Sequence, residues 1–263
     1  MNEKIAVLGP QGTFTEKAAK SIDESASLIY MNDVEDVFKF VTGGMGDGVI
    51  AIENSLEGSV LNNLMLLKDN KVYITDEITL DISLCLMSGQ NTSMDEITTI
   101  MSHSHALAQC RKYLKQYFEK RQLISTASTA EAMKKASEKQ GIGAIGFGEF
   151  ASTYHLKIIE NDIQDKQSQT RFLRISKDLG GGPKSSIIFA GKDKPGLLYE
   201  ILKIFALQNI NLTKIESRPS RQRLGEYVFY LDFLDERISD DEREEILNEV
   251  KKNSTFFKYL GSY

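Results

Sequence analysis

The chain has 263 residues, of which 41% are hydrophobic and 26% charged, and its net charge is −5 at pH 7. These values are typical of a globular protein with one large domain or two. No basic cluster indicates a nucleic-acid partner, and no apolar stretch of about 18 residues predicts a membrane span. The charged first residues predict no signal peptide, and Cys85 and Cys110 are too few for a disulfide framework. We therefore expect a reduced, cytoplasmic protein.

Two segments in the N-terminal part predict strand–turn–helix units. Residues 4–8 have the pattern of a buried strand, and a glycine-containing turn follows at once. Thr13 and Glu16 then have the spacing of a capping box, which predicts the start of a helix. Residues 49–52 form a second buried-strand pattern, which leads into the polar segment 53–60 and another helix. Such units build an α/β domain.

The middle of the chain repeats this alternation. A strand over 97–101 leads into Ser102–His103, and we expect one helix after it with Cys110 on its buried face. Ser128 and Glu131 have the spacing of a second capping box. The other expected elements are a helix over 33–42, strand-like segments over 71–87, strands over 123–126, 141–147 and 172–175, a short helix over 149–154, and a polar connection over 158–169.

The pattern changes after Gly180-Gly181-Gly182-Pro183, which is the clearest linker in the sequence. Beyond it, the expected elements are a strand over 185–190, a helix over 196–207, strands over 211–217 and 226–233, a helix over 239–252 and a strand over 256–260. This βαββαβ order predicts a ferredoxin-like module.

Small polar residues follow several predicted strands and begin the next helices. They include Thr13, Ser55, Ser102 and Ser128. In α/β sheets the carboxyl ends of the strands form the binding crevice, and helix N-termini offer free N–H groups to anions. Thr170 and Arg171 add a hydroxyl and a guanidinium at the start of another strand. The pattern predicts a site for a small, multiply anionic molecule.

Several common cofactor and metal motifs are missing from the sequence. The glycine loops do not match a P-loop, Gly9–Gly12 is no dinucleotide fingerprint, and no HExxH, CxxC or GxSxG occurs. His103 and His105 lie two residues apart at a predicted helix start, a spacing that does not favour binding of one metal ion. We therefore expect neither a metal nor a cofactor.

Together, the motifs resemble those of the prephenate dehydratase family. The matching segments are Gly9–Phe14, Glu53–Val60, Ser102–His103, Ala106–Cys110, Ser128–Ala130 and Thr170–Phe172. The C-terminal module is similar to an ACT domain, with Pro195–Leu198 and Glu216–Pro219 standing where this family binds phenylalanine. The resemblance covers essentially the whole chain. No chorismate-mutase helices lead it, so we expect the monofunctional bacterial type.

The resemblance implies an α/β fold with two parts. One is a two-lobed catalytic domain like a type II periplasmic binding protein, and the other is the ferredoxin-like βαββαβ ACT domain. We expect the catalytic domain over 1–179, with lobe one at about 1–78 and 160–179 and lobe two at about 79–159. The linker is then 180–184 and the ACT domain 185–263.

Members of this family convert prephenate to phenylpyruvate with loss of CO2 and water, an aromatisation that needs no cofactor. The resemblance implies that Thr170 is the donor to the leaving hydroxyl, with Asn54 and Gln109 as the other catalytic residues. The implied substrate-binding residues are Thr13, Glu53, Ser55, Glu57, Ser102, His103, Ser128, Thr129, Arg171 and Phe172. Arg171 either anchors a substrate carboxylate or pairs with Glu53 or Glu57, and Phe172 is also expected in the core.

The resemblance further implies feedback inhibition by phenylalanine. The effector-binding residues are then Gly196, Leu197, Leu198, Asn211, Glu216, Ser217, Arg218 and Pro219. Because ACT domains of this family bind phenylalanine between subunits, we expect a homodimer or homotetramer paired through these domains. Two departures are visible: Ser104 and His105 replace the usual Pro and Gln, and Leu197 and Tyr199 alter the common Gly-Ala-Leu-Val loop. The second departure can change effector affinity.

Two other functions fit the same sequence features. Arogenate, with an amino group in place of the keto group, can undergo the same chemistry. A non-catalytic cytosolic amino-acid sensor can have the same two-lobed fold. A sensor has no need for Thr170, Asn54 and Gln109 in one cleft, so these three residues favour the enzyme.

Overall fold

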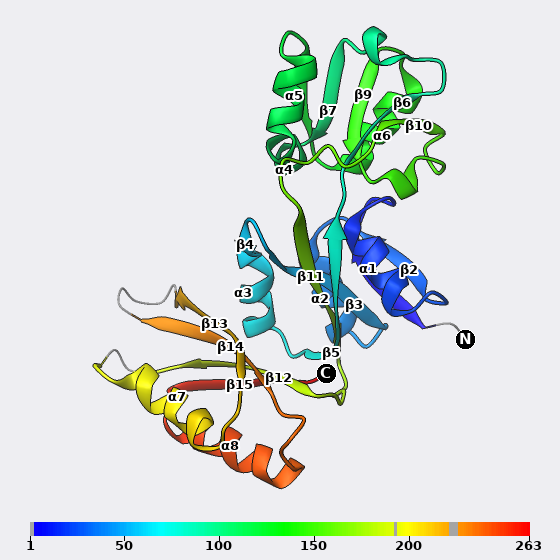
Figure 1. Cartoon of the computed structure of the whole chain (residues 1–263). Helices are drawn as coiled ribbons and strands as arrows, with labels where there is room; N and C mark the ends of the chain where they lie inside the picture. Colours follow the sequence, from blue (N-terminus) through cyan, green and yellow to red (C-terminus); the bar gives the residue numbers. More distant parts are fainter. Residues whose placement is uncertain (1–2, 192–193, 221–225) are drawn as a thin grey trace. The chain divides into compact units, whose positions relative to one another are not determined.

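The computed structural model describes residues 3–191, 194–220 and 226–263 (Figure 1). Within these ranges the strands form three sheets, and no helix is long and apolar enough to cross a membrane. The chain divides into two compact units, one of Met1–Val37, Val49–Leu61 and Ile78–Phe172, the other of Phe38–Gly48, Asn62–Glu77 and Leu173–Tyr263. The domain boundaries expected from the sequence differ from this division and stay a prediction.

The first sheet joins strands that are far apart in the sequence. Its strands run in the order β2-β1-β3-β11-β5, and β4 pairs with β3. They are β1 (Lys4–Leu8), β2 (Ser27–Met31), β3 (Asp47–Asn54), β4 (Gly58–Ser59), β5 (Tyr73–Ile82) and β11 (Ser168–Ser176). The helices of this part are α1 (Phe14–Ile22), α2 (Val34–Thr42) and α3 (Leu61–Asp69). Ile5, Val7, Val49 and Phe172 are buried in one core, as expected for central strands covered on both faces.

The second sheet has the order β10-β6-β9-β7-β8. Its strands are β6 (Cys85–Gly89), β7 (Thr99–His103), β8 (Gln122–Thr126), β9 (Ile142–Gly146) and β10 (Leu156–Glu160). Its helices are α4 (Ser104–Gln109), α5 (Arg111–Phe118) and α6 (Thr129–Glu138), with the 3₁₀ turns η1 (Met94–Glu96) and η2 (Gly148–Phe150).

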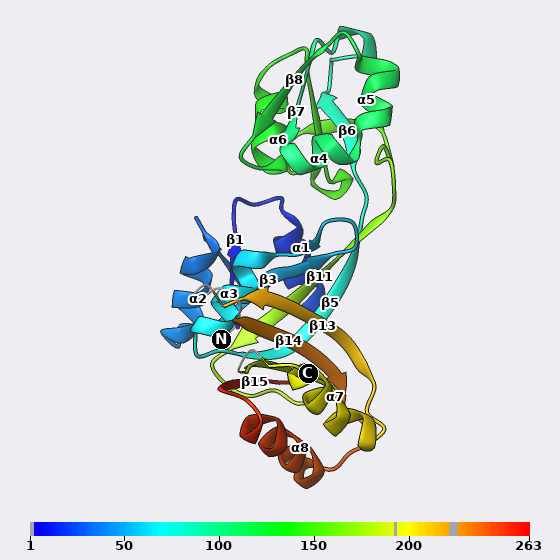
Figure 2. The ribbon, with the colours of Figure 1, turned by 90° about the vertical axis from the view of Figure 1, so that its left-hand side faces the viewer.

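Side-chain alternation gives this second sheet two cores. Leu86 and Ile145 pack with Leu114 of α5, whereas their sequence neighbours Met87 and Ala144 pack with α6. Because successive side chains of a strand point to opposite faces, α5 and α6 cover opposite faces of the sheet (Figure 2).

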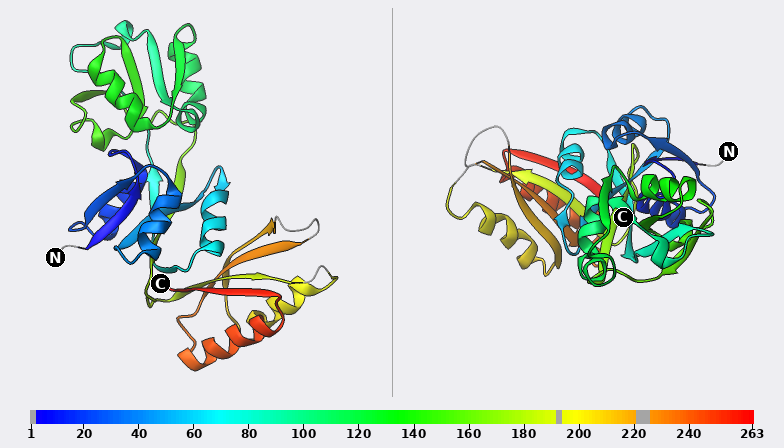
Figure 3. Two further views of the ribbon diagram at one scale, coloured as in Figure 1. Left: turned by 180° about the vertical axis from the view of Figure 1, so that it is seen from behind. Right: turned by 90° about the horizontal axis from the view of Figure 1, so that it is seen from above.

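The third sheet confirms the predicted βαββαβ order. Its strands run β13-β14-β12-β15, and each neighbouring pair is antiparallel. The elements are β12 (Lys184–Ala190), α7 (Leu197–Leu207), β13 (Leu212–Pro219), β14 (Tyr227–Leu234), α8 (Asp240–Lys252) and β15 (Phe256–Ser262). Both helices lie on one face of the sheet (Figure 3), where Phe189, Phe205 and Phe233 form the centre of a buried core.

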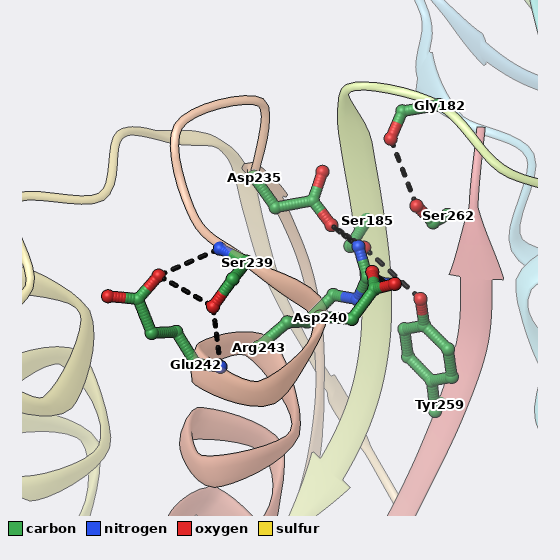
Figure 4. Close-up of polar contacts among 9 residues, drawn as sticks. All are labelled: Gly182, Ser185, Asp235, Ser239, Asp240, Glu242, Arg243, Tyr259 and Ser262. Atoms are coloured by element: carbon green, nitrogen blue, oxygen red, sulfur yellow. Dashed lines mark hydrogen bonds and ion pairs between the residues drawn. The ribbon is translucent and has the colours of Figure 1, made fainter.

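A buried polar network links three elements of this module (Figure 4). Ser185 of β12 donates its hydroxyl to Asp235 Oδ2 at 2.6 Å, and Arg243 Nη1 of α8 lies 3.1 Å from the same oxygen. The Ser185 hydroxyl also lies 3.3 Å from the Tyr259 hydroxyl of β15. Because the Asp235 side chain is 0% exposed, its charge depends on Arg243 and Ser185 for compensation.

Capping differs from the prediction at two helices. Thr13 accepts a hydrogen bond from the Glu16 N–H at 3.4 Å, as predicted, but the Glu16 carboxylate accepts from the Gly12 N–H at 2.6 Å. The glutamate of a complete capping box would accept from the Thr13 N–H instead. The start of α6 repeats this arrangement with Ser128, Glu131 and Ala127. Each glutamate therefore holds the loop residue before the cap. The complete box is found at α8, between Ser239 and Glu242.

Three other expectations about local structure are wrong. The single helix expected after Ser104 is two helices, α4 and α5, with a break at Cys110. The connection over 158–169 begins within a strand, β10, which pairs with β6. The short helix expected over 149–154 is the 3₁₀ turn η2 followed by turns.

Candidate active site

Asn54 and Thr170 are brought together from the ends of neighbouring strands. Asn54 ends β3, Thr170 lies in β11, and these strands are adjacent in the first sheet. Asn54 Nδ2 donates to Thr170 Oγ1 at 2.9 Å. Asn54 Oδ1 accepts from the backbone N–H groups of Leu56 and Glu57, at 2.9 and 3.1 Å. Because these donors fix the orientation of the amide, the Thr170 oxygen is an acceptor from Asn54 and its hydrogen is left for another acceptor.

The loop after β3 is tied to β11 on both sides of this pair. Ser55 N–H donates to the Gln169 carbonyl at 2.8 Å, and Gln169 N–H donates to the Ser55 hydroxyl at 2.9 Å. Arg171 Nη2 lies 3.4 Å from Glu53 Oε2. The structure therefore gives Arg171 the second of its two expected roles, as the partner of Glu53. Thr170 is held between two interactions that fix the register of this loop.

Glu57 connects the same loop to α4 of the second sheet. Its Oε2 lies 2.7 Å from His105 Nδ1, and its Oε1 accepts from Gln109 Nε2 at 3.2 Å. His105 and Gln109 are four residues apart, so they lie on one face of α4. Among the described residues, Gln109 is linked to Thr170 indirectly. It donates to Glu57, whose backbone N–H donates to Asn54, and Asn54 donates to Thr170.

Ser102 and His103 end β7 but face different ways. Ser102 is 0% exposed, and its hydroxyl donates to the Ile145 carbonyl at 2.7 Å. In this structure the hydroxyl hydrogen of Ser102 serves the sheet, and its expected substrate contact stays a prediction. His103 is partly buried and caps α4, where its Nδ1 accepts from the His105 N–H at 3.4 Å. Burial and then the nearby His105 lower the pKa of His103.

Two more predicted residues serve their helix starts. Thr13 is the cap of α1, and its hydroxyl donates to the Leu8 carbonyl at 3.2 Å. Ser128 caps α6, and Thr129 is its first helical residue. Among the described residues, no hydrogen bond joins Thr13, Ser128 or Thr129 to Thr170, so what they offer a ligand is the N–H groups of the two helix N-termini.

Phe172 and Cys110 belong to the core. Phe172 is 1% exposed among apolar side chains, so its expected core position holds, and its expected substrate contact stays a prediction. Cys110 is fully buried, and burial raises the pKa of its thiol to about 12. A thiol of this kind is not a thiolate near neutral pH and does not act as a nucleophile.

Comparison with known proteins identifies the family of this fold and site. A family model described as prephenate dehydratase matches residues 5–179, and one described as ACT domain matches residues 185–253. The chain belongs to the prephenate dehydratase family. It is 41% identical to the prephenate dehydratase of Methanocaldococcus jannaschii, over 100% of this chain and 98% of that protein.

Two further relatives cover nearly all of the chain. A protein of Arabidopsis thaliana named arogenate dehydratase/prephenate dehydratase 2 is 30% identical, over 99% of this chain and 72% of its own length. The crystal structure of a prephenate dehydratase from Arthrobacter aurescens in complex with L-phenylalanine superposes with a TM-score of 0.88 and 29% identity. That match covers 98% of this chain and 88% of the other.

In this family member, the predicted effector residues border the start of α7 and the edge strand β13. Gly196 caps α7 in a left-handed conformation with φ 89°. Leu198 packs into the core of the module, while Asn211 is exposed. The remaining positions are Leu197 in the first turn of α7 and, in β13, Glu216, Ser217, Arg218 and Pro219. Glu216 is ion-paired with both Lys214 and Arg218.

Sequence reasoning missed two contacts of the dehydratase site. Tyr154 donates its hydroxyl to the Gln11 carbonyl at 2.5 Å, and no local pattern around Tyr154 indicated this. The His105–Glu57 contact had a signal in the sequence, because His105 shares a helix face with Gln109. What was missing was knowledge that the loop 53–60 faces that helix.

Proposed function

We propose that this chain converts prephenate to phenylpyruvate and that phenylalanine inhibits the reaction through the ACT domain. The observation that carries the catalytic part is the hydrogen bond from Asn54 Nδ2 to Thr170 Oγ1. An oxygen that accepts from an amide is more polarised, so its own hydrogen becomes a better donor. The site thus holds one oriented hydroxyl donor, as the departure of a hydroxide requires.

The reaction needs one proton donor and no redox partner. The bond between the ring carbon and the carboxylate breaks, CO2 leaves, and the electron pair of this bond enters the ring. The ring then expels the hydroxyl at the opposite carbon, which takes up a proton and leaves as water. Thr170 supplies the hydrogen bond, and late in the step the proton, to that oxygen. A positioned donor of this kind typically contributes ~10²–10⁴-fold to the rate.

The two carboxylates of prephenate need donors that are not already engaged. The N-termini of α1 and α6 supply backbone N–H groups beside Thr13, Ser128 and Thr129. Arg171 neutralises Glu53 and so removes one negative charge that would repel the substrate. Gln109, held by Glu57, is the side chain that α4 contributes.

The regulatory part of the proposal rests on the ACT module. A phenylalanine bound beside Gly196, Asn211 and the strand Leu212–Pro219 would meet a helix N-terminus with its carboxylate. The L-phenylalanine complex of the Arthrobacter aurescens relative supports this choice of effector. We also propose that the ACT domains pair two or four copies of the chain, since β13 is an edge strand of its sheet.

Arogenate is the second candidate substrate, because the Arabidopsis relative carries both names. The amino group of arogenate replaces only the keto oxygen, which is remote from the leaving hydroxyl, so the Thr170 chemistry is unchanged. The binding-only alternative has no use for an oriented Thr170 hydroxyl.

The deciding experiment measures phenylpyruvate formation from prephenate, and phenylalanine formation from arogenate, each with and without added phenylalanine. We expect turnover of prephenate that phenylalanine suppresses. Turnover of arogenate alone would replace the substrate. Turnover of neither would favour the sensor, and unsuppressed turnover would remove the regulatory half of the proposal.

A further inference from the structure

Position 105 makes a contact that the usual residue of the family would make differently. His105 Nδ1 lies 2.7 Å from Glu57 Oε2, while Gln109 donates to the other oxygen of the same carboxylate at 3.2 Å. Each Glu57 oxygen therefore has one partner on α4. An amide at this position, such as Gln, would be neutral at every pH. Imidazole is the side chain whose charge ordinarily changes between pH 5 and 8.

The contact is linked to the proposed donor by a short series of bonds. The Glu57 N–H donates to Asn54 Oδ1 at 3.1 Å, and Asn54 Nδ2 donates to Thr170 Oγ1 at 2.9 Å. Whatever holds Glu57 therefore also holds the loop that orients the Asn54 amide. Glu57 is the only residue of this series with a side-chain partner on α4 among the contacts of the described residues.

We propose, on the basis of the dehydratase function proposed above, that His105 is a positioning residue whose protonated form holds Glu57 and thereby favours the reactive arrangement of Asn54 and Thr170. A hydrogen bond between two charged groups is about twice as strong as one between neutral groups. The interaction is therefore strongest when the imidazole carries a proton on both nitrogens. Deprotonation weakens it without removing it.

Among the described residues, the titratable side chains in contact with His105 are Glu57 of the loop and His103. His103 is the last residue of β7 and the cap of α4, and its ring centroid lies 5.0 Å from that of His105. Burial and the neighbouring His105 lower the pKa of His103. His103 Nδ1 also accepts from the His105 N–H, which requires that nitrogen to be unprotonated. His105 is therefore the imidazole that contacts the Glu57 carboxylate.

Solvent limits the size of the effect. The His105 side chain is 65% exposed and that of Glu57 38%, so water and salt screen the pair. Exposed ion pairs of this kind contribute about a two- to five-fold change in an equilibrium constant. The effect falls on KM, because bound substrate itself holds the loop once it has entered the site.

The test is the pH profile of the His105→Gln variant, which restores the usual family residue. We expect the ratio of wild-type to variant kcat/KM to fall by about two- to five-fold between pH 5.5 and 8.5. This fall should come from KM and not from kcat. The matched control is His155→Asn, because His155 has φ 53° and Asn tolerates that conformation. The ratio of wild-type to this control should stay constant. A constant ratio for His105→Gln, or a change confined to kcat, overturns the proposal.

A second measurement does not depend on activity. A double-mutant cycle of His105→Leu and Glu57→Gln in thermal unfolding reports the coupling between the two side chains. We expect the coupling to be larger at pH 5.5 than at pH 8.5. Equal coupling at both pH values contradicts the proposal even if the enzyme is active. If the coupling depends on pH but the protein has no activity on prephenate, the proposed function is wrong while the pH-dependent contact between His105 and Glu57 stands.

Discussion

The Asn54 amide decides which atom of Thr170 is open to a ligand. Two backbone N–H groups occupy Asn54 Oδ1, so its Nδ2 must face the Thr170 oxygen. The direction of this hydrogen bond therefore follows from the contacts and not from an arbitrary amide assignment. A threonine hydroxyl is a very weak acid, and its use as a donor depends on such preorganisation.

Replacing Thr170 with Val removes the hydroxyl at nearly constant volume. We expect kcat to fall by ~10²–10⁴-fold, since the donor to the leaving hydroxyl is lost. Thr170→Ser should recover part of this loss, because a hydroxyl is again within reach of Asn54. Steady-state kinetics measure both variants, with thermal unfolding as the control for folding. A Val variant with near-normal kcat would remove Thr170 from the mechanism.

Ser102 shows what the sequence did and did not predict at this scale. Its position at the end of β7 was predicted correctly, but its role was not. Ser102 is two residues after Ile100, so strand alternation places both on the buried face. Applying that period to the motif would have predicted that Ser102 is buried, but not its bond to the Ile145 carbonyl. Asn54 and Thr170 are far apart in the sequence, so only the family resemblance indicated that both belong to one site.

At the scale of elements, the strands that were missed or mistaken for a connection are β2, β4 and β10. β2 and β10 are each an edge strand of their sheet, and β4 has only two residues. Polar residues such as Lys157 and Glu160 weaken the apolar pattern of β10, whereas β2 has an apolar pattern that the prediction did not use. The buried strands β1 and β9 were predicted within one residue, whereas β3 and β11 extend two to four residues beyond the predicted segments. The break between α4 and α5 had no signal, because Cys110 is neither Gly nor Pro.

Lys258 of β15 links the ACT module to α3. Its ammonium donates to the carbonyls of Leu67 and Asn70, at the C-terminal end of that helix, where a positive charge is favourable. Lys68 of the same helix lies over the Phe256 ring at 5.9 Å. In the sequence, α3 follows the loop that carries Glu57.

Burial lowers the pKa of Lys258 to about 8 from 10.5. Between these two pH values the unfolded chain holds the proton more tightly than the folded protein, so stability from this group rises with pH. We expect urea unfolding at pH 7.5 and 10 to show wild-type gaining stability relative to Lys258→Met. Lys252→Met on α8, with a side chain 73% exposed, should show no such trend. A relative loss of wild-type stability over this range would contradict the assignment.

At the scale of the whole molecule, regulation requires that effector and substrate favour different states. If phenylalanine lowers the affinity for prephenate by some factor, prephenate must lower the affinity for phenylalanine by the same factor. This coupling is therefore tested by changing a residue at the start of α7 in the ACT domain and measuring catalysis and its inhibition at the Thr170 site. Gly196 suits this purpose because no described residue beyond its chain neighbours lies within 4 Å of an added Cβ, so we expect a substitution there to act through the backbone.

Gly196→Ala should weaken inhibition and leave turnover intact. At φ 89° an alanine costs about 1–2 kcal/mol. We expect the backbone at the start of α7 to relieve this strain by leaving the conformation that binds phenylalanine. We expect the concentration for half inhibition to rise about five- to thirty-fold, with kcat unchanged. Gly44→Ala is the matched control, since Gly44 has φ 70° and meets only the flexible Lys177 side chain. It should lose similar stability and keep normal inhibition. If both variants lose inhibition equally, general destabilisation explains the effect; if neither does, the effector lies elsewhere than at the start of α7.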